Sequence, residues 1–140
     1  MRIALASDHA GFELKEAAKK WLDADELIDE GTNSIDSVDY PDYAAKVARD
    51  VQEKKADYGV LVCGSGIGMS IAANRFKGVR AALCRSIEDA RLAREHNDAN
   101  VLVLGGRVTR EGDAKKIVEA FFSTEFSGAG RHSRRVKKMG

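Results

Sequence analysis

The 140-residue chain has very little cysteine, with only Cys63 and Cys84. Two thiols are too few for the disulfide framework of a small secreted protein. No stretch resembles a secretory signal, and no run of about 18 residues is apolar enough to span a membrane. We therefore expect a cytoplasmic protein with free thiols.

The chain also lacks a large excess of charge of either sign, because its formal net charge at pH 7 is +1. A nearly neutral protein has no general affinity for nucleic acid or for a membrane surface, so neither partner is expected. The three histidines are scattered, and no group of His, Cys, Asp and Glu has metal-ligand spacing. We predict neither a metal nor a cofactor. Only residues 124–140 are locally basic, which fits either a solvated helix or a site for an anionic ligand.

Proline is almost absent, and no internal repeat or low-complexity segment interrupts the chain. Apolar runs alternate with amphipathic segments from end to end, and the apolar runs show no polar alternation. Strands of this kind are buried on both faces, and regular alternation with helices implies a parallel sheet with right-handed crossovers. The sequence predicts a single α/β domain over residues 1–140, a three-layer sandwich with a basic C-terminal tail or helix at 124–140. The strands are predicted at 2–6, 26–29, 58–63, 79–84 and 101–104, and the helices at about 14–22, 42–54, 69–74, 86–96 and 114–122.

In a sheet of this type ligands bind at the carboxyl ends of the strands, so the turn CGSGIG at 63–68 is a candidate site. Its backbone N–H groups at a helix N terminus suit phosphate or another oxyanion. The turn lacks the lysine of a nucleoside-triphosphate loop, and its glycine spacing does not match a dinucleotide fingerprint. A hydrolase elbow would need glycine at Cys63. Because a helix N terminus stabilises a thiolate, Cys63 is a candidate base or nucleophile, whereas we interpret Cys84 as a small buried apolar side chain.

Two further polar turns carry candidate side chains. Asp8 and His9 follow the first strand, and His96 and Asn97 precede the last one. We expect both turns at or near the carboxyl rim of the sheet, close to Cys63. Either histidine could instead be an ordinary hydrogen-bonding group of the structure.

Five segments in order resemble the family of sugar-phosphate isomerases that includes ribose-5-phosphate isomerase type B. They are SDHAGFELK, DYPDYA, CGSGIGMSIAANRFKGVRAALC, AREHNDANVLVLGGR and GRHSRRV. The resemblance implies a Rossmann-like αβα sandwich with a five-stranded parallel sheet. It also implies a homodimer, or a tetramer, in which each active site uses both subunits. The implied reaction is metal-independent aldose–ketose isomerisation of D-ribose 5-phosphate and D-ribulose 5-phosphate through an enediolate, a step of the pentose phosphate pathway.

The resemblance assigns roles by position. Cys63 is expected to be the base that moves the proton between carbons 2 and 1, Ser65 to donate or relay a hydroxyl proton, and His96 to assist opening of the furanose ring. The glycine loop would hold the enediolate oxygen with fixed N–H donors. The expected substrate-binding residues are Asp8, His9, Tyr40, Gly64, Ser65, Gly66, Ile67, Gly68, Asn97, Arg107, Arg131 and Arg135. Among them His9 and the three arginines would hold the phosphate, some of them across the dimer.

Other substrates and a role without catalysis stay open at this point. One branch of the family has a glutamate where this chain has Met69, so the resemblance places the chain in the cysteine branch. Related members act on allose 6-phosphate or galactose 6-phosphate, and galactose-type members divide the site residues between two different chains. The presence of Cys63, His96 and the arginines in one chain favours a self-sufficient homodimer acting on ribose 5-phosphate. The remaining alternative is a phosphosugar-binding module that does not turn over its ligand.

Overall fold

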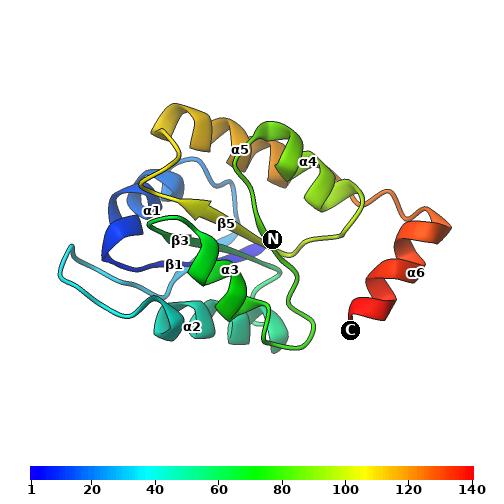
Figure 1. Cartoon of the computed structure of the whole chain (residues 1–140), viewed down its shortest axis with the longest axis horizontal. Coiled ribbons are helices and arrows are strands. Elements are labelled where there is room, and N and C mark those ends of the chain that lie inside the picture. The colour runs from blue at the N-terminus through cyan, green and yellow to red at the C-terminus, as the bar shows by residue number, and fades with distance from the viewer.

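The computed structural model describes all 140 residues, and its backbone alternates strands and helices until two consecutive helices end the chain (Figure 1). A short 3₁₀ helix at His9–Gly11 separates the first strand from the first α-helix. None of the helices is both long and apolar enough to cross a membrane. The strands are β1 (Arg2–Ser7), β2 (Glu26–Asp29), β3 (Tyr58–Cys63), β4 (Ala81–Leu83) and β5 (Val101–Gly105), and the α-helices are α1 (Phe12–Lys19), α2 (Tyr40–Gln52), α3 (Ile67–Ala73), α4 (Ile87–Glu95), α5 (Glu111–Ser123) and α6 (Gly130–Met139).

The five strands form one parallel sheet in the order β2-β1-β3-β5-β4. From β1 the chain moves outward to β2 and then returns past β1 to β3. The direction of winding therefore reverses between β1 and β3, and the turns that follow these two strands open at the same point of the sheet. This is where ligands bind in open α/β sheets.

Both faces of the sheet are covered by helices, which explains why its central strands β1, β3 and β5 are mainly apolar. Val60 and Val62 of β3 face the layer of α1, α4 and α5, whereas Leu61 and Cys63 face the layer of α2 and α3. The two layers lie on opposite sides of the sheet in Figure 1. The predicted three-layer αβα architecture is confirmed.

Strand β4 is shorter than the predicted 79–84 because it lies at the edge of the sheet. The side-chain amide of Asn74 occupies the open side of its first residue, where it donates to the Ala81 carbonyl at 2.9 Å and accepts from the Ala81 N–H at 2.7 Å. The N–H of Arg80 bonds to the side chain of Asn100 instead of to a strand. Side chains thus replace the strand neighbour that β4 lacks.

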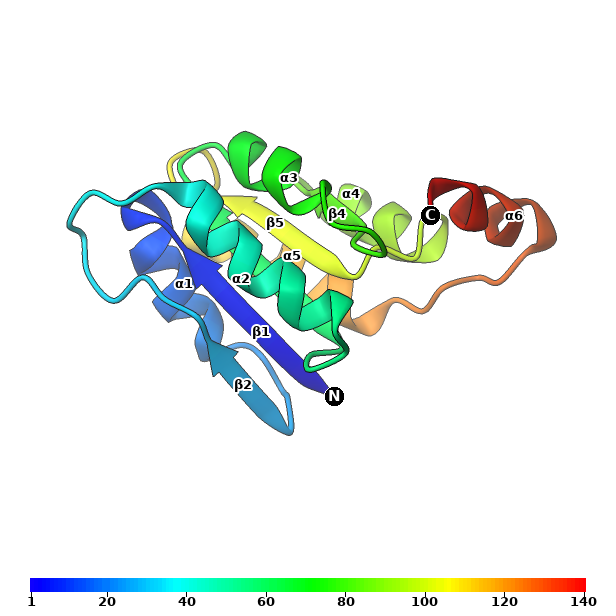
Figure 2. The same ribbon diagram turned by 90° about the horizontal axis from the view of Figure 1, so that it is seen from below.

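The basic tail forms a ten-residue helix, α6, outside the layered body. In both views it lies beyond the amino ends of the central strands, next to the end of α4 (Figures 1 and 2). The segment between α5 and α6 is held to α4 by the Ser127 N–H, which donates to the Glu95 carbonyl at 3.0 Å. The tail therefore has a defined position at the amino edge of the sheet.

Candidate active site

Three turns meet at the carboxyl edge of the sheet, after β1, β3 and β5. The N–H of Asp8 donates to the Val62 carbonyl at 3.2 Å, which joins the first turn to β3. The N–H groups of Gly106 and Arg107 donate to the carbonyls of Cys63 and Gly64 at 2.7 and 2.9 Å, which joins the third turn to the second. These backbone bonds hold the three turns as one surface.

Glycine at two positions lets the turns approach this closely. A Cβ at Gly11 would lie 2.4 Å from the Val62 carbonyl oxygen, and one at Gly105 would lie 2.6 Å from the Ser65 carbonyl oxygen. Both distances are below any van der Waals contact, and the obstructing atoms are backbone. A larger residue at either position would separate the turns.

Cys63 is the last residue of β3 and only 4% exposed. Its sulfur accepts a hydrogen bond from the Gly66 N–H at 3.2 Å. Gly66 can point its N–H back at the sulfur because its φ is +81°, a left-handed conformation that side chains disfavour. Gly66 thus supplies a fixed N–H donor that can stabilise negative charge on the Cys63 sulfur.

Several N–H groups of the glycine loop have no acceptor within the chain. Those of Gly64, Ser65 and Gly68 make no hydrogen bond to backbone or side chain. The Ile67 N–H is different, because it donates to the Ser65 hydroxyl oxygen at 3.2 Å. The loop therefore offers three free donors beside Cys63, and Ser65 keeps its own hydroxyl proton free to donate.

Asp8 and His9 are both fixed by hydrogen bonds beside this loop. The buried Asp8 carboxylate accepts from the Gly11 N–H at 3.0 Å, and Nδ1 of His9 accepts from the Val38 N–H at 3.2 Å. An imidazole that accepts at Nδ1 is neutral and carries its proton on Nε2. His9 therefore anchors the long loop before α2 and keeps an Nε2–H donor available.

Arg107 lies near the start of the glycine loop and Tyr40 near its end. A Cβ on Gly68 would be 2.5 Å from the Tyr40 ring, and a Cβ on Gly64 would be 3.4 Å from Cδ of Arg107. The Arg107 side chain is exposed and makes no salt bridge within the chain. Of the predicted site residues, the structure thus brings Asp8, His9, Tyr40, residues 63–68 and Arg107 together at the carboxyl edge.

The prediction that the His96 turn lies at the same rim is wrong within one chain. His96 and Asn97 follow α4 and precede β5, and in a parallel sheet every turn that leads into a strand lies at the amino edge. The register confirms this placement, because Cys63 pairs with the last residue of β5, Gly105, whereas Val101 begins that strand. His96 and Asn97 are therefore a strand length away from Cys63.

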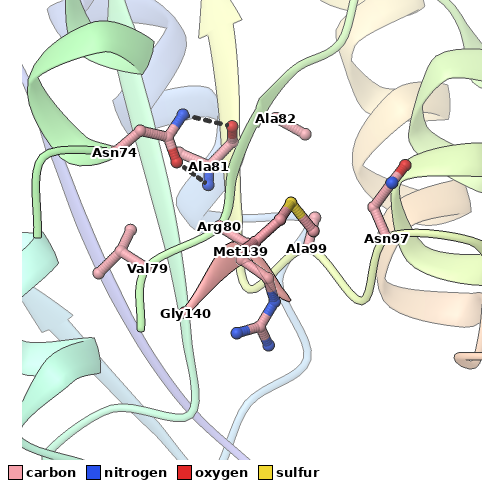
Figure 3. A pocket seen from close by; sticks show the side chains of 9 residues that line it. All are labelled: Asn74, Val79, Arg80, Ala81, Ala82, Asn97, Ala99, Met139 and Gly140. Atoms are coloured by element: carbon pink, nitrogen blue, oxygen red, sulfur yellow. Dashed lines mark hydrogen bonds between the residues drawn. The ribbon is translucent and has the colours of Figure 1, made fainter. Parts of the chain in front are cut away.

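At the amino edge Asn97 lines a cavity of about 500 Å³ between β4 and the end of α6. Figure 3 shows Met139 of α6 lying between Asn97 and the residues that begin β4. Arg131 and Arg135 project from the same helix and are exposed. The predicted site residues thus form two separate groups, and the second consists of His96, Asn97, Arg131 and Arg135.

Comparison with known proteins agrees with this geometry. Residues 3–139 match the model of a family described as ribose/galactose isomerase. The chain belongs to this family. Among relatives, ribose-5-phosphate isomerase B of Escherichia coli is 46% identical over 140 residues, covering 99% of this chain and 93% of that protein.

Solved structures of the family have the same fold. A ribose 5-phosphate isomerase from Thermotoga maritima is 56% identical with a TM-score of 0.94, over 99% of this chain and 96% of its own. Ribose-5-phosphate isomerase B of Clostridium thermocellum is 47% identical with a TM-score of 0.96, over 100% and 95% of the two chains. The predictions of a Rossmann-like fold and of a sugar-phosphate isomerase are confirmed.

Two residues of this isomerase that the sequence analysis did not single out shape the amino-edge group. The ring of His132 stacks on that of His96, with centroids 4.3 Å apart and planes inclined by 10°. The buried guanidinium of Arg94 donates to the Asp98 carboxylate at 2.9 Å and to the Ala99 carbonyl at 2.7 Å. The segment GRHSRRV contains His132, but only the folded chain shows what its ring contacts.

Cys84 has the inert character predicted for it. It is fully buried, and burial, with a smaller effect from Asp89, raises the pKa of its thiol to about 12. A thiol with this pKa stays protonated at neutral pH and is no nucleophile. The two cysteines of the isomerase are therefore not equivalent.

Proposed function

We propose that this isomerase interconverts D-ribose 5-phosphate and D-ribulose 5-phosphate, with Cys63 as the base. The observation that carries the proposal is the hydrogen bond from the Gly66 N–H to the Cys63 sulfur, beside three N–H donors with no acceptor in the chain. A base and an oxyanion site side by side are what proton transfer next to a carbonyl needs. The relatives named as ribose-5-phosphate isomerases support ribose as the sugar.

In the proposed reaction the Cys63 thiolate removes the proton from carbon 2 of the open-chain aldose. The electrons of the C–H bond move to the carbonyl and leave an enediolate. The N–H groups of Gly64, Ser65 and Gly68 stabilise its oxygen, and one donor of this kind contributes about 3–4 kcal/mol in other enzymes. The thiol then returns the proton to carbon 1, while the Ser65 hydroxyl relays the proton between the two oxygens.

The substrate is proposed to lie between the glycine loop and the turn after β1. Nε2–H of His9 and the Arg107 guanidinium are donors suited to phosphate oxygens. The Asp8 carboxylate, fixed by the Gly11 N–H, suits the hydroxyl groups of the sugar. The Tyr40 ring, which lies against Gly68, forms the side wall.

We propose that a second copy of the chain supplies the other half of each site. One chain holds His96, Asn97, Arg131 and Arg135 at the edge opposite to Cys63, so it cannot complete its own site. Helix α3, which directly follows the glycine loop, exposes Ile67 by 48% and Ile71 by 61%. An apolar helix face next to an incomplete site fits an interface between subunits. His96 of the second copy would then protonate ring oxygen O4 of ribose 5-phosphate as the ring opens.

The first experiment measures conversion of ribose 5-phosphate to ribulose 5-phosphate, with and without EDTA, by wild type and by Cys63→Ala. Turnover that resists the chelator and is lost in the variant, while phosphate binding persists, is the expected result. Allose 6-phosphate and galactose 6-phosphate in parallel assays test the alternative substrates. Ligand binding without turnover of any sugar phosphate would contradict the enzymatic function and favour a binding module.

Subunit complementation tests the shared site. Cys63→Ala and His96→Ala are each expected to be nearly inactive as pure proteins. If equal amounts of the two are unfolded together and refolded with random pairing, half of the dimers are mixed. Each mixed dimer contains one intact site out of two, so about a quarter of the wild-type activity returns. No recovery despite mixed dimers, shown by tagged subunits, would contradict a site built from two chains. Sedimentation of the wild type separates dimer from tetramer.

A further inference from the structure

His132 covers one face of the His96 ring and is the one buried residue of α6, with 8% exposure. Neither ring nitrogen of His132 makes a hydrogen bond within the chain. Its contact with His96 is therefore one of stacked faces, which leaves the edges of both rings free. Nothing in the proposed reaction uses His132 itself.

The backbone around His96 is fixed independently of its ring. Arg94 bonds to Asp98 and Ala99 on one side and, through Nε, to the Thr124 carbonyl at 3.3 Å on the other. None of these bonds reaches the His96 imidazole, which has only Glu95 near Nε2, at 3.8 Å. The orientation of the ring therefore depends on what lies against its face, and that is His132.

The same contact also holds α6 against the end of α4, because His132 is the only side chain that the helix buries. Apart from His132 the helix presents mainly charged side chains, including Arg131 and Arg135, which lie one turn apart on one side of it. A helix docked through one buried side chain turns or shifts when that side chain is removed. The tips of both arginines would then move relative to His96.

We propose that His132 is a positioning residue that fixes the His96 ring and docks α6, so that the ring-opening imidazole and Arg131 and Arg135 reach the substrate as one unit. This inference rests on the proposed function, in which His96 assists ring opening and the arginines hold phosphate. During ring opening the C1–O4 bond breaks, O4 gains a proton and the anomeric hydroxyl loses one. A ring that turns away from O4 cannot make that transfer, and displacement by about 1 Å can cost about 100-fold in rate.

The charge state of His132 supports this role. Burial lowers its pKa, and the neighbouring His96, Arg131 and Arg135 lower it further, whereas Glu95 acts in the opposite direction. A neutral ring can lie against His96 without repelling it when His96 holds a proton.

The test compares His132→Ala, which removes the stacked ring, with His132→Phe, which keeps an aromatic face. Arg134→Ala is the matched control, because Arg134 is exposed on the same helix and belongs to neither half of the proposed site. Conversion of ribose 5-phosphate is measured together with exchange of the C1 hydrogen of ribulose 5-phosphate in D₂O. That exchange needs Cys63 but no ring opening, because ribulose 5-phosphate is an open chain.

For His132→Ala we expect a loss of about 10-fold to 100-fold in kcat for ribose 5-phosphate and a raised inhibition constant for inorganic phosphate. At saturating ribulose 5-phosphate, C1 exchange should stay within about twofold of wild type. His132→Phe should restore most of the conversion, and Arg134→Ala should behave like wild type. If His132 only supported stability, both His132 variants would have a lower unfolding midpoint and the same ratio of conversion rate to exchange rate as the wild type. That result would overturn the proposal. So would a phenylalanine variant as impaired as the alanine variant.

Imidazole proton NMR separates this inference from the proposed function. The chain has only three histidines, so each signal is assigned by one substitution. Loss of the ring-current shift of His96 in His132→Ala, its retention in His132→Phe, and weaker phosphate binding in the alanine variant would support positioning even if the wild type turned over no sugar. Unchanged His96 signals in His132→Ala would refute the positioning role of His132, even if the wild type were a fully active enzyme.

Discussion

Replacing Asp50 with asparagine should stabilise the protein at neutral and alkaline pH. Asp50 lies on α2 with 9% exposure, and its Oδ2 is buried without a hydrogen-bond partner. Burial is the largest cause, and together with the nearby Glu30 carboxyl it raises the pKa of this carboxyl from 3.8 to about 6. Lys55 offsets only part of this effect.

The sign of the effect follows from linkage. Because the pKa of Asp50 is higher in the folded than in the unfolded chain, protonation of Asp50 favours folding. This contribution is complete below pH 3.8 and is lost as the pH rises through about 6. A folded-state pKa that is higher by about 2 destabilises the folded chain by about 3 kcal/mol at a pH where Asp50 is ionised in both states. Asp50→Asn removes the ionisation, so the free energy of unfolding should increase by up to about 3 kcal/mol at pH 8 and by about half as much at pH 5.

Urea unfolding at pH 5 and pH 8, at one fixed protein concentration, measures this difference. Asp23→Asn is the control, because Asp23 is exposed and makes no salt bridge. Glu30→Gln should also stabilise the chain at pH 8, since it removes the second charge. An Asp50→Asn variant with the same gain at both pH values, or with a loss at pH 8, would refute the reasoning.

Three further substitutions test other contacts. Gly66→Ala should cost about 2 kcal/mol or more and most of the turnover, because the residue has φ +81° and a methyl group would lie 2.5 Å from Cδ1 of Leu83; urea unfolding and initial rates check both. Phe121→Ala should cost about 3–5 kcal/mol, because the side chain is fully buried, but should leave kcat of the folded protein unchanged. Lys15→Met should destabilise the chain at pH 7 by about 3 kcal/mol, because the buried ammonium bonds to Asp29 at 2.7 Å. Burial opposes ionisation of Asp29, but Lys15, Lys19 and the Gly31 N–H lower its pKa, so this loss should shrink when the unfolding free energy is measured at pH 3.

Much of the fold could be read from local patterns. The three central strands β1, β3 and β5 were predictable because they are buried on both faces and are therefore mainly apolar. The glycine turn after β3 could be proposed as a candidate site because its position after a buried strand fixes which edge of the sheet it faces. The start of β4 was predicted less well, since the Asn74 amide that replaces a strand neighbour at Ala81 comes from a residue outside the strand.

The sequence by itself determined the αβα architecture, the identity of the thiol beside the glycine loop and the family. It could not place His96 relative to Cys63, because both residues adjoin strands and only the direction of β5 decides which edge each one occupies. Nor could it show the stacking of His132 on His96 or the anchoring of the turn by Arg94, since these contacts depend on where α6 packs. Periodicity along a chain records which faces are buried, whereas the meeting of distant side chains is decided only when the elements pack in three dimensions.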